Sequence, residues 1–253
     1  MRVMQTMQWR SLDEMFGELE RPEGCSIEQL GRVDIQQITM LLGTWYPDIR
    51  VGTESRHLEP SFYERDVYLQ GESPDRPVYA MVCRHRATRD IIGLLTLERN
   101  VRGLQLSAAM GALEPTQRGQ GLGQYGISVL EHVGRSIGAE VVLYYSTLKL
   151  ARAQRNAEQQ GFKLVGLVPA FDMDAISPGT VKRVYEAIYA KVLVGPEKVH
   201  LPDWNALIPS TRALYTHLFG EHPAAAAAER VSAPRPVRPA VPMSSSVSEV
   251  RHG

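Results

Sequence analysis

The chain has 253 residues, 43% of them hydrophobic, which is enough to bury a substantial core. Lysine plus arginine and aspartate plus glutamate number 28 each, and this zero net charge does not favour a nucleic acid or an anionic membrane surface as a partner. Only two cysteines occur, Cys25 and Cys83, which excludes a disulfide scaffold and a cysteine-rich zinc site. No signal peptide or membrane-spanning apolar run is visible, so we expect a cytoplasmic protein.

The first part of the chain predicts a mixture of helices and strands. Residues 1–24 carry apolar side chains at helical spacing, which indicates a helical extension that docks on the domain or frays. Asp34 is placed to cap a helix that Pro47 ends, and Gly71 is placed to end a second helix. The expected elements are a strand at 25–31, helices at 33–47 and 59–71, an antiparallel pair of strands at 77–85 and 90–100, and a third strand at 103–113.

The hydrophobic pattern changes to helical spacing at residue 121. A short polar helix after residue 150 is expected to end at Gly161, and Ser210 is placed to cap the last helix. From residue 223 the chain is rich in Pro, Ala and Ser, which predicts a disordered tail. The expected elements are a helix at 121–138, strands at 139–147, 163–171 and 181–194, and a helix at 209–220.

The stretch EPTQRGQGLGQYG, residues 114–126, contains two overlapping glycine motifs. Gly121, Gly123 and Gly126 spell G-x-G-x-x-G, the fingerprint of dinucleotide-binding folds. Arg118, Gly121 and Gly123 spell R-x-x-G-x-G, a loop that holds the pyrophosphate of coenzyme A. Either motif would present backbone N–H groups and the positive end of a helix dipole to an anion.

The dinucleotide interpretation fits the surrounding sequence less well. In such a fold the first glycine directly follows the strand, whereas Pro115 and several polar residues here separate Leu113 from Gly121. The next strand ends in YYSTLK and lacks the acid that would bind the ribose hydroxyls. A nicotinamide-dependent oxidoreductase therefore stays as an alternative that NAD(P)H binding would reveal.

The segment GALEPTQRGQGLGQYGISVLEHV resembles motif A of the GNAT superfamily of N-acetyltransferases, with its strand, following proline, glycine loop and amphipathic helix. Gly161-Phe162, between a short helix and a strand, is also typical of that family. The resemblance implies an α/β domain of the α+β type, in which helices flank a mixed, mostly antiparallel central sheet. The implied organisation is a helical extension at 1–24, an acyltransferase domain at 25–194, a helical extension at 195–222 and a disordered tail at 223–253.

By this resemblance acetyl-CoA is the cosubstrate and no metal takes part. Its pyrophosphate would meet the backbone N–H groups of the loop, where glycines remove the Cβ atoms that block close approach. The strand before the loop would splay from the strand after it, and the pantetheine arm would lie in that gap. The cofactor-binding residues implied are Ala112, Leu113, Arg118, Gly119, Gln120, Gly121, Leu122 and Gly123.

The general acid is where the sequence departs from the family. Many members carry a tyrosine four residues before the glycine of Gly-Phe, and here that position is Ala157. Tyr144 and Tyr145 are the alternative acids, because one of two adjacent strand residues must face the cleft. Glu98, at the end of a strand, is the candidate base, and Glu114 beside the loop is a weaker candidate.

The sequence therefore predicts direct acetyl transfer to a primary amine of a small molecule, with a main-chain N–H between Met110 and Ala112 as the donor to the carbonyl oxygen. The alternative is an inactive acyl-CoA-binding sensor or assembly module, which the missing helix tyrosine favours. Loops 48–76 and 169–181 would select the acceptor, and residues 195–220 would cover the cleft or form a homodimer interface. No nucleic acid, membrane or metal partner is expected.

Overall fold

The computed structural model describes residues 7–223. Met4, part of the predicted N-terminal stripe, and the predicted tail beyond Pro223 lie outside the described residues. Contacts divide the chain into two units, and the division falls between Val199 and His200.

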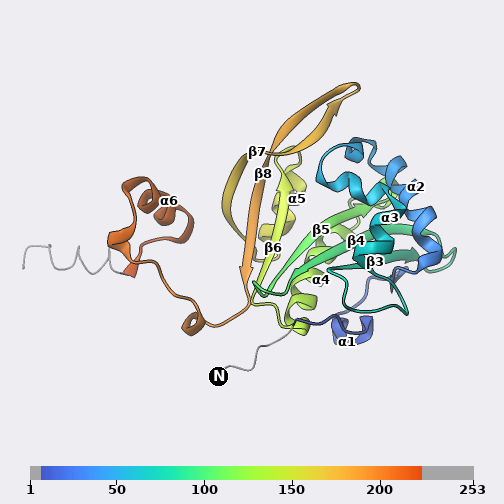
Figure 1. The fold of residues 1–253 in the computed structure, drawn as a ribbon, viewed down its shortest axis with the longest axis horizontal. Helices are drawn as coiled ribbons and strands as arrows, with labels where there is room; N and C mark the ends of the chain where they lie inside the picture. The colour runs from blue at the N-terminus through green and yellow to red at the C-terminus, as the bar shows by residue number, and fades with distance from the viewer. Residues whose placement is uncertain (1–6, 224–253) are drawn as a thin grey trace, which may run out of the picture. The chain divides into compact units, whose positions relative to one another are not determined.

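One sheet organises the first unit, in the order β1-β3-β4-β5-β6-β8-β7 with β2 beside β3 (Figure 1). Neighbouring strands are antiparallel except for the pairs β2–β3 and β5–β6. The prediction of a mixed, mostly antiparallel sheet with flanking helices is confirmed. The strands are β1 (Cys25–Gln29), β2 (Val67–Tyr68), β3 (Val78–His85), β4 (Ile91–Asn100), β5 (Gln105–Leu113), β6 (Val141–Thr147), β7 (Lys163–Ser177) and β8 (Thr180–Val192).

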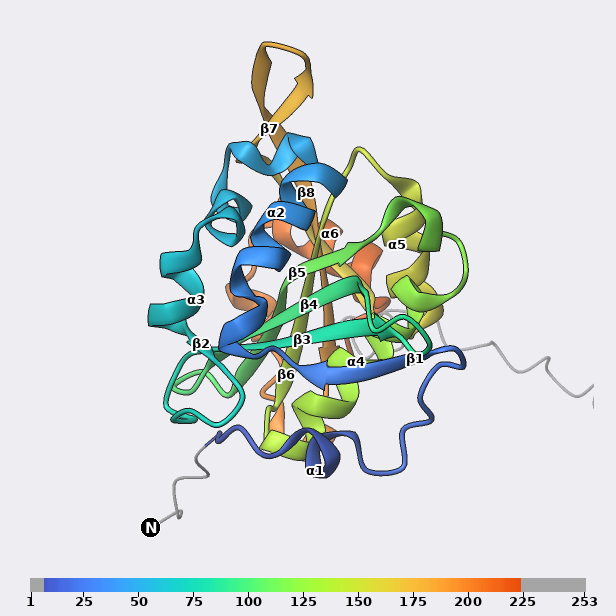
Figure 2. The same ribbon diagram turned by 90° about the vertical axis from the view of Figure 1, so that its right-hand side faces the viewer.

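Helices cover both faces of this sheet (Figure 2). On one face, called the α4 face below, α1, α4 and α5 share a hydrophobic core with the sheet. On the other, called the α2 face, α2 and α3 enclose a second core. Successive side chains of a strand alternate between the two faces, so register decides which core each one joins. The helices are α1 (Leu12–Phe16), α2 (Ile35–Trp45), α3 (Pro60–Asp66), α4 (Leu122–Ile137) and α5 (Ala151–Gln159).

Helix α4 forms where the sequence predicts it. Buried residues recur at helical spacing along its inner side, among them Leu130, Val133 and Ile137. The helix follows Gly121 and stops at Gly138, whose φ angles are 90° and 85°. Glycine adopts these left-handed angles without a Cβ penalty, so the two residues fix where the helix begins and ends.

The N-terminal residues join the same core as α4. Met7, Trp9, Met15 and Phe16 are buried there, and Ser11 caps the single short helix α1. The expected extension is thus mostly non-helical over the described part of residues 1–24, and it packs against the sheet.

Two predictions about the first helices are wrong in detail. Asp34 occupies the N-cap position of α2 but makes no side-chain bond to the helix. Its carboxylate accepts from Gly31 N at 3.2 Å and pairs with Arg84 at 2.7 Å, because a preceding 3-10 turn gives Asp34 helical torsion angles. The helix expected at 59–71 ends at Asp66, since the residues after it pair with β3 as the short strand β2.

The loop predicted at 169–181 is instead the outer part of a β-hairpin. Register shifts between Val168, which pairs with Glu186, and Asp172, which pairs with Val184. The extra residues form a bulge that bends β7 without ending it, so the strand continues past residue 171, where the sequence predicts its end. The hairpin projects beyond the rest of the sheet (Figure 2).

The second unit contains the helix α6 (Pro209–Phe219), which confirms the helix predicted at 209–220. The cap predicted at Ser210 is wrong: Ile208 is the N-cap residue, and Pro209 takes the first helical position, where its missing N–H costs nothing.

Candidate functional site

A gap between the parallel strands β5 and β6 is the central feature of the first unit. The two strands pair over only three positions, from Gln105 with Val141 to Ser107 with Leu143. Beyond them β5 stays with β4 and β6 stays with β8, so the edges that face each other are unpaired. A register shift opposite Thr96 marks a β-bulge in β5 where the strands diverge, and bulges bend a strand in this way.

The glycine loop lies at the open end of this gap, between the end of β5 and the start of α4. Gly119 and Gly121 each have φ 90°, which other residues adopt only with strain. The backbone N–H groups of residues 119–123 have no acceptor within the described chain, and no side chain caps α4. A Cβ added at Gly121 would meet no atom within 4 Å. These open donors at a helix N-terminus form a cradle of the kind that binds phosphate groups.

The side chain of Arg118 points away from this cradle. Its Nη2 donates to Trp45 O at 2.9 Å, its Nε donates to Leu113 O at 3.2 Å, and its guanidinium lies 4.4 Å from the centroid of the Tyr46 ring. Arg118 therefore fastens the loop to the C-terminal end of α2. The cation beside the cradle is Arg152 of α5, whose Nη1 lies 3.6 Å from a Cβ built on Gly119. Sequence analysis missed it because only the fold brings α5 to the loop.

The backbone groups that face the gap belong to alternate residues of β5. Glu114 N donates to Ile92 O on β4, so Leu113 and Gly111 direct their N–H and C=O groups the other way. Leu113 is engaged within the chain, because its N–H donates to the Tyr46 hydroxyl at 3.1 Å and its carbonyl accepts from Arg118.

Gly111 is exposed, and a Cβ there would meet no atom within 4 Å. Ala112, by contrast, is buried and pairs with Leu94 of β4. Of the residues at the end of β5, Gly111 thus offers its backbone to a ligand in the gap.

Tyr144 and Tyr145 begin the part of β6 that has left β5, and they face opposite sides of the sheet. Tyr144 lies on the α4 face beside Tyr189, and burial raises its pKa to about 12, so the phenol keeps its proton at neutral pH. Tyr145 lies on the α2 face, stacked on Phe171 with ring centroids 5.8 Å apart. Burial also raises the pKa of Tyr145, and the charge of Glu186 adds to the effect.

The predicted base Glu98 lies on the α2 face of β4, opposite Ser107 at the closed end of the gap. Its carboxylate is paired with Arg56 at 2.9 Å, so one oxygen is engaged by a permanent cation. Ser107 donates to Glu98 O at 3.4 Å, and Ser146 donates to Thr147 O at 3.3 Å.

Glu186 of β8 is a candidate base that sequence analysis missed. It pairs with Thr147 of β6, which places it one strand from the gap on the α2 face. Burial, followed by the negative charges of Asp172 and Glu54, raises its pKa to about 7. A carboxylate of this basicity takes up a proton efficiently near neutral pH. The alternation of 181–194 predicted a strand, but only the register shows which acids surround Glu186.

The position that carries a tyrosine in many GNAT members holds a buried alanine in this chain and offers no hydroxyl group. Ala157 is fully buried in the core beneath α5. No group of three or more His, Cys, Asp or Glu residues within 7–223 is arranged to hold a metal ion. In the same part of the chain, no helix combines the length and hydropathy needed to cross a membrane.

Comparisons with known proteins identify the fold. No family model matches the chain, and no curated protein matches it in sequence. Among solved structures, mutant forms of the spermidine/spermine N-acetyltransferase SpeG from Vibrio cholerae superpose with a TM-score of 0.53 at 14% identity, over 68% of this chain and 95% of SpeG. A dodecameric structure of that enzyme gives the same TM-score at 15% identity, over the same shares of the two chains. A protein provisionally named phosphinothricin N-acetyltransferase gives 0.52 at 15% identity, over 68% and 99%.

The chain thus has the GNAT acetyltransferase fold, as the resemblance of its glycine loop and the flanking strand and helix predicts. At 14–15% identity this likeness establishes the fold alone.

Proposed function

We propose that the protein is an N-acetyltransferase that moves the acetyl group of acetyl-CoA directly to the primary amine of a small molecule. The observation that carries the proposal is the gap between β5 and β6 with an uncapped glycine loop at its mouth. The N–H groups of residues 119–123 would bind the pyrophosphate, with Arg152 as the neighbouring cation. The backbone of Gly111 would bind the part of the cosubstrate that enters the gap. When bound, acetyl-CoA supplies an acyl thioester to the acceptor.

In this proposal one residue acts as the general base and another as the general acid. Glu186 takes a proton from the acceptor ammonium, so that the amine carries a free electron pair when it attacks. The carbon–nitrogen bond forms as the carbon–sulfur bond breaks, and the neutral phenol of Tyr144 gives a proton to the departing sulfur. The nitrogen releases a second proton to solvent as it becomes an amide, and solvent returns a proton to the Tyr144 phenolate. Gly111 N–H, which faces the gap, is the candidate donor to the carbonyl oxygen.

The acidic character of the α2 face supports an amine as the acceptor. Glu186 lies within electrostatic reach of Asp172 and Glu54, and Glu98 lies on the same face. An alkylammonium ion would be attracted to such a surface. The structural neighbour SpeG is named a spermidine/spermine N-acetyltransferase, and an amine acceptor for this chain agrees with that name.

A second candidate function is acyl-CoA binding without turnover. The buried Ala157, in place of the helix tyrosine, favours it. The two functions share the loop and differ only in the release of free CoA.

The proposal is tested by titrating the purified chain with acetyl-CoA, CoA and NADH in a calorimeter, and then measuring thiol release with a panel of small amines. We expect binding of both CoA species, no binding of NADH, and amine-dependent release of CoA. Gly123→Glu should abolish binding, whereas Gly166→Glu, which adds the same side chain where a Cβ meets no atom within 4 Å, should not. Binding without turnover would favour the sensor, and binding of NADH alone would reject both.

A further inference from the structure

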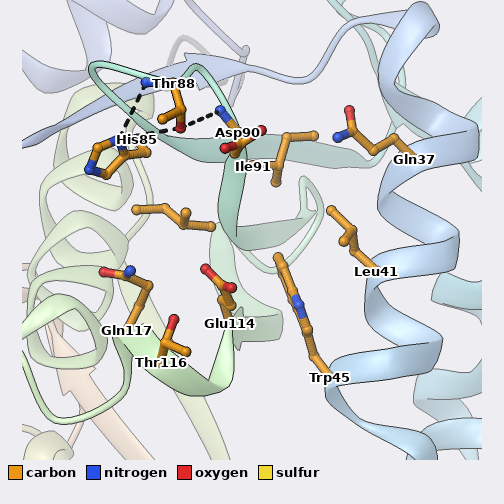
Figure 3. A pocket seen from close by; sticks show the side chains of 11 residues that line it. Gln37, Leu41, Trp45, His85, Thr88, Asp90, Ile91, Glu114, Thr116 and Gln117 are labelled. Atoms are coloured by element: carbon orange, nitrogen blue, oxygen red, sulfur yellow. Dashed lines mark hydrogen bonds between the residues drawn. The ribbon is translucent and has the colours of Figure 1, made fainter.

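A cavity of about 450 Å³ lies beside the gap but on other elements: α2, the turn between β3 and β4, and the residues that follow β5 (Figure 3). Its volume is in the range of pockets that hold small molecules. The proposed acetyl transfer uses none of the side chains that line it.

Part of the cavity wall is apolar. The indole of Trp45 forms one side, and Leu41 continues this side along α2. Ile91 and Ile92, at the start of β4, contribute aliphatic surface between the two elements. This wall suits a ligand with a hydrocarbon or aromatic body, because such a body gains by leaving water.

Two carboxylates give the cavity its charge. Figure 3 shows Glu114 directed into the space between Trp45 and Gln117, with Asp90 at the rim. Neither carboxylate has a hydrogen bond or ion pair with any other residue of the described chain. Two unpaired carboxylates beside one cavity repel an anion, so the phosphates of CoA are unsuited to this place.

Of the two arginines near these acids, one is ion-paired elsewhere and the other bonds only to carbonyls. Arg89, next to Asp90, donates to Ser26 at 2.9 Å and pairs with Glu28 at 2.5 Å. Arg118, near Glu114 in sequence, donates to the carbonyls of Trp45 and Leu113. Bonds to carbonyls leave the charge of Arg118 in place, and this charge offsets one of the two carboxylates. The cavity therefore combines an apolar wall with an excess of one negative charge.

We propose that this cavity binds a small organic cation with an apolar body, such as an arylalkylammonium ion. Its ammonium group lies between Glu114 and Asp90, where charge-assisted hydrogen bonds are available. Its body lies against Leu41 and Trp45, whose aromatic ring also attracts a cation. The site is separate from Glu186 and the acceptor side of the gap, and it does not depend on the proposed acetyl transfer.

Calorimetric titration of the full chain, without CoA, with 2-phenylethylammonium tests the proposal. We expect saturable binding with one ion per chain and a dissociation constant on the order of 1 mM, as for a small ligand with few contacts. The uncharged 2-phenylethanol should bind at least about tenfold more weakly, because it forms no charge-assisted hydrogen bond.

Variants separate this cavity from the acceptor side of the gap. Glu114→Gln and Asp90→Asn should each weaken binding of the ion by about tenfold, and both should fold because neither carboxylate has a protein partner. Glu59→Gln, at an exposed glutamate on α3's N-terminal side, and Glu186→Gln should leave it unchanged.

Three results would overturn the proposal: no saturable binding, equal binding of the alcohol, or binding that depends on Glu186 and not on Glu114 or Asp90. The last result would place the ion on the acceptor side of the gap and leave the proposed transferase intact. A chain that binds the ion in this cavity but releases no CoA with any amine would instead contradict only the transferase.

Discussion

The hydroxyl of Tyr46 accepts a hydrogen bond from Leu113 N at 3.1 Å, and this N–H is one of the backbone donors that face the gap between β5 and β6. Leu113 is also among the cofactor-binding residues that the sequence predicts, and a cosubstrate that uses this N–H in addition to Gly111 must displace the hydroxyl. We therefore expect Tyr46→Phe to bind acetyl-CoA about fivefold more tightly, since the free protein loses about 1 kcal/mol that the complex does not lose. Calorimetry measures the change.

Tyr185→Phe is the matched control, because Tyr185 is 56% exposed on β8 and should leave affinity unchanged. Weaker binding by Tyr46→Phe would show that the Tyr46 hydroxyl supports the bound state and does not compete with it.

The two arginines near the loop should separate stability from affinity. Arg118→Ala removes the bonds to Trp45 O and Leu113 O, so we expect the thermal midpoint to fall by about 2–4 °C for a loss of about 1 kcal/mol. Arg152→Ala removes an exposed cation that has no ion pair in the described chain, so stability should not change. Its affinity for acetyl-CoA should fall by about tenfold, and by less at high salt. The opposite pattern would make Arg118 the phosphate ligand.

These arginines also show which parts of the site a sequence can reveal. Gly119 and Gly121 were found from local spacing, because a positive φ is a property of a single residue. The partner of Arg118 cannot be found from local spacing, since Trp45 lies 73 positions away and only the packing of α2 brings it close. For the same reason the conformation of the glycines follows from the sequence, and the direction of the Arg118 side chain does not.

The same distinction between local signals and long-range packing applies to the elements of the fold. Helix α4 and the strands around it follow from hydrophobic period and glycine stops. The full length of the hairpin of β7 and β8 does not follow from these signals, because a bulge between Val168 and Asp172 lets β7 continue past residue 171. Glu186 lies in a predicted strand, yet its basicity comes from burial and from Asp172 and Glu54, which are distant in sequence.

The basicity of Glu186 predicts a bend in the pH dependence of activity. Its pKa of about 7 means that the carboxylate is free to accept a proton only above that pH. We expect kcat/KM to rise through pH 7 and Glu186→Gln to lower it by about 10²-fold, the usual contribution of a general base. The bend should also vanish from the variant's profile. A bend that persists in Glu186→Gln would assign it to another group or to the acceptor.

The same pKa predicts a pH-dependent stability. The folded chain holds the proton of Glu186 up to about pH 7, whereas the unfolded chain releases it near 4.5, so folding becomes less favourable as pH rises between these values. Glu186→Gln removes this cost. After allowance for partial solvent exposure, its thermal midpoint should exceed that of the wild type by about 2–4 °C at pH 8 and match it near pH 4.5. Equal midpoints at both pH values would contradict a buried, charge-repelled Glu186.

The last prediction distinguishes the two adjacent tyrosines. Tyr144 faces α4, and its pKa of about 12 keeps a proton available for the departing thiolate, while Tyr145 stacks on Phe171 on the other face. Tyr144→Phe keeps the ring and removes only the hydroxyl, so we expect kcat to fall by about 10²-fold with little change in acetyl-CoA affinity. Tyr145→Phe is the matched control and should retain kcat. Equal activity of both variants would mean that the thiolate leaves without an acid, which the buried Ala157 at the usual tyrosine position already allows.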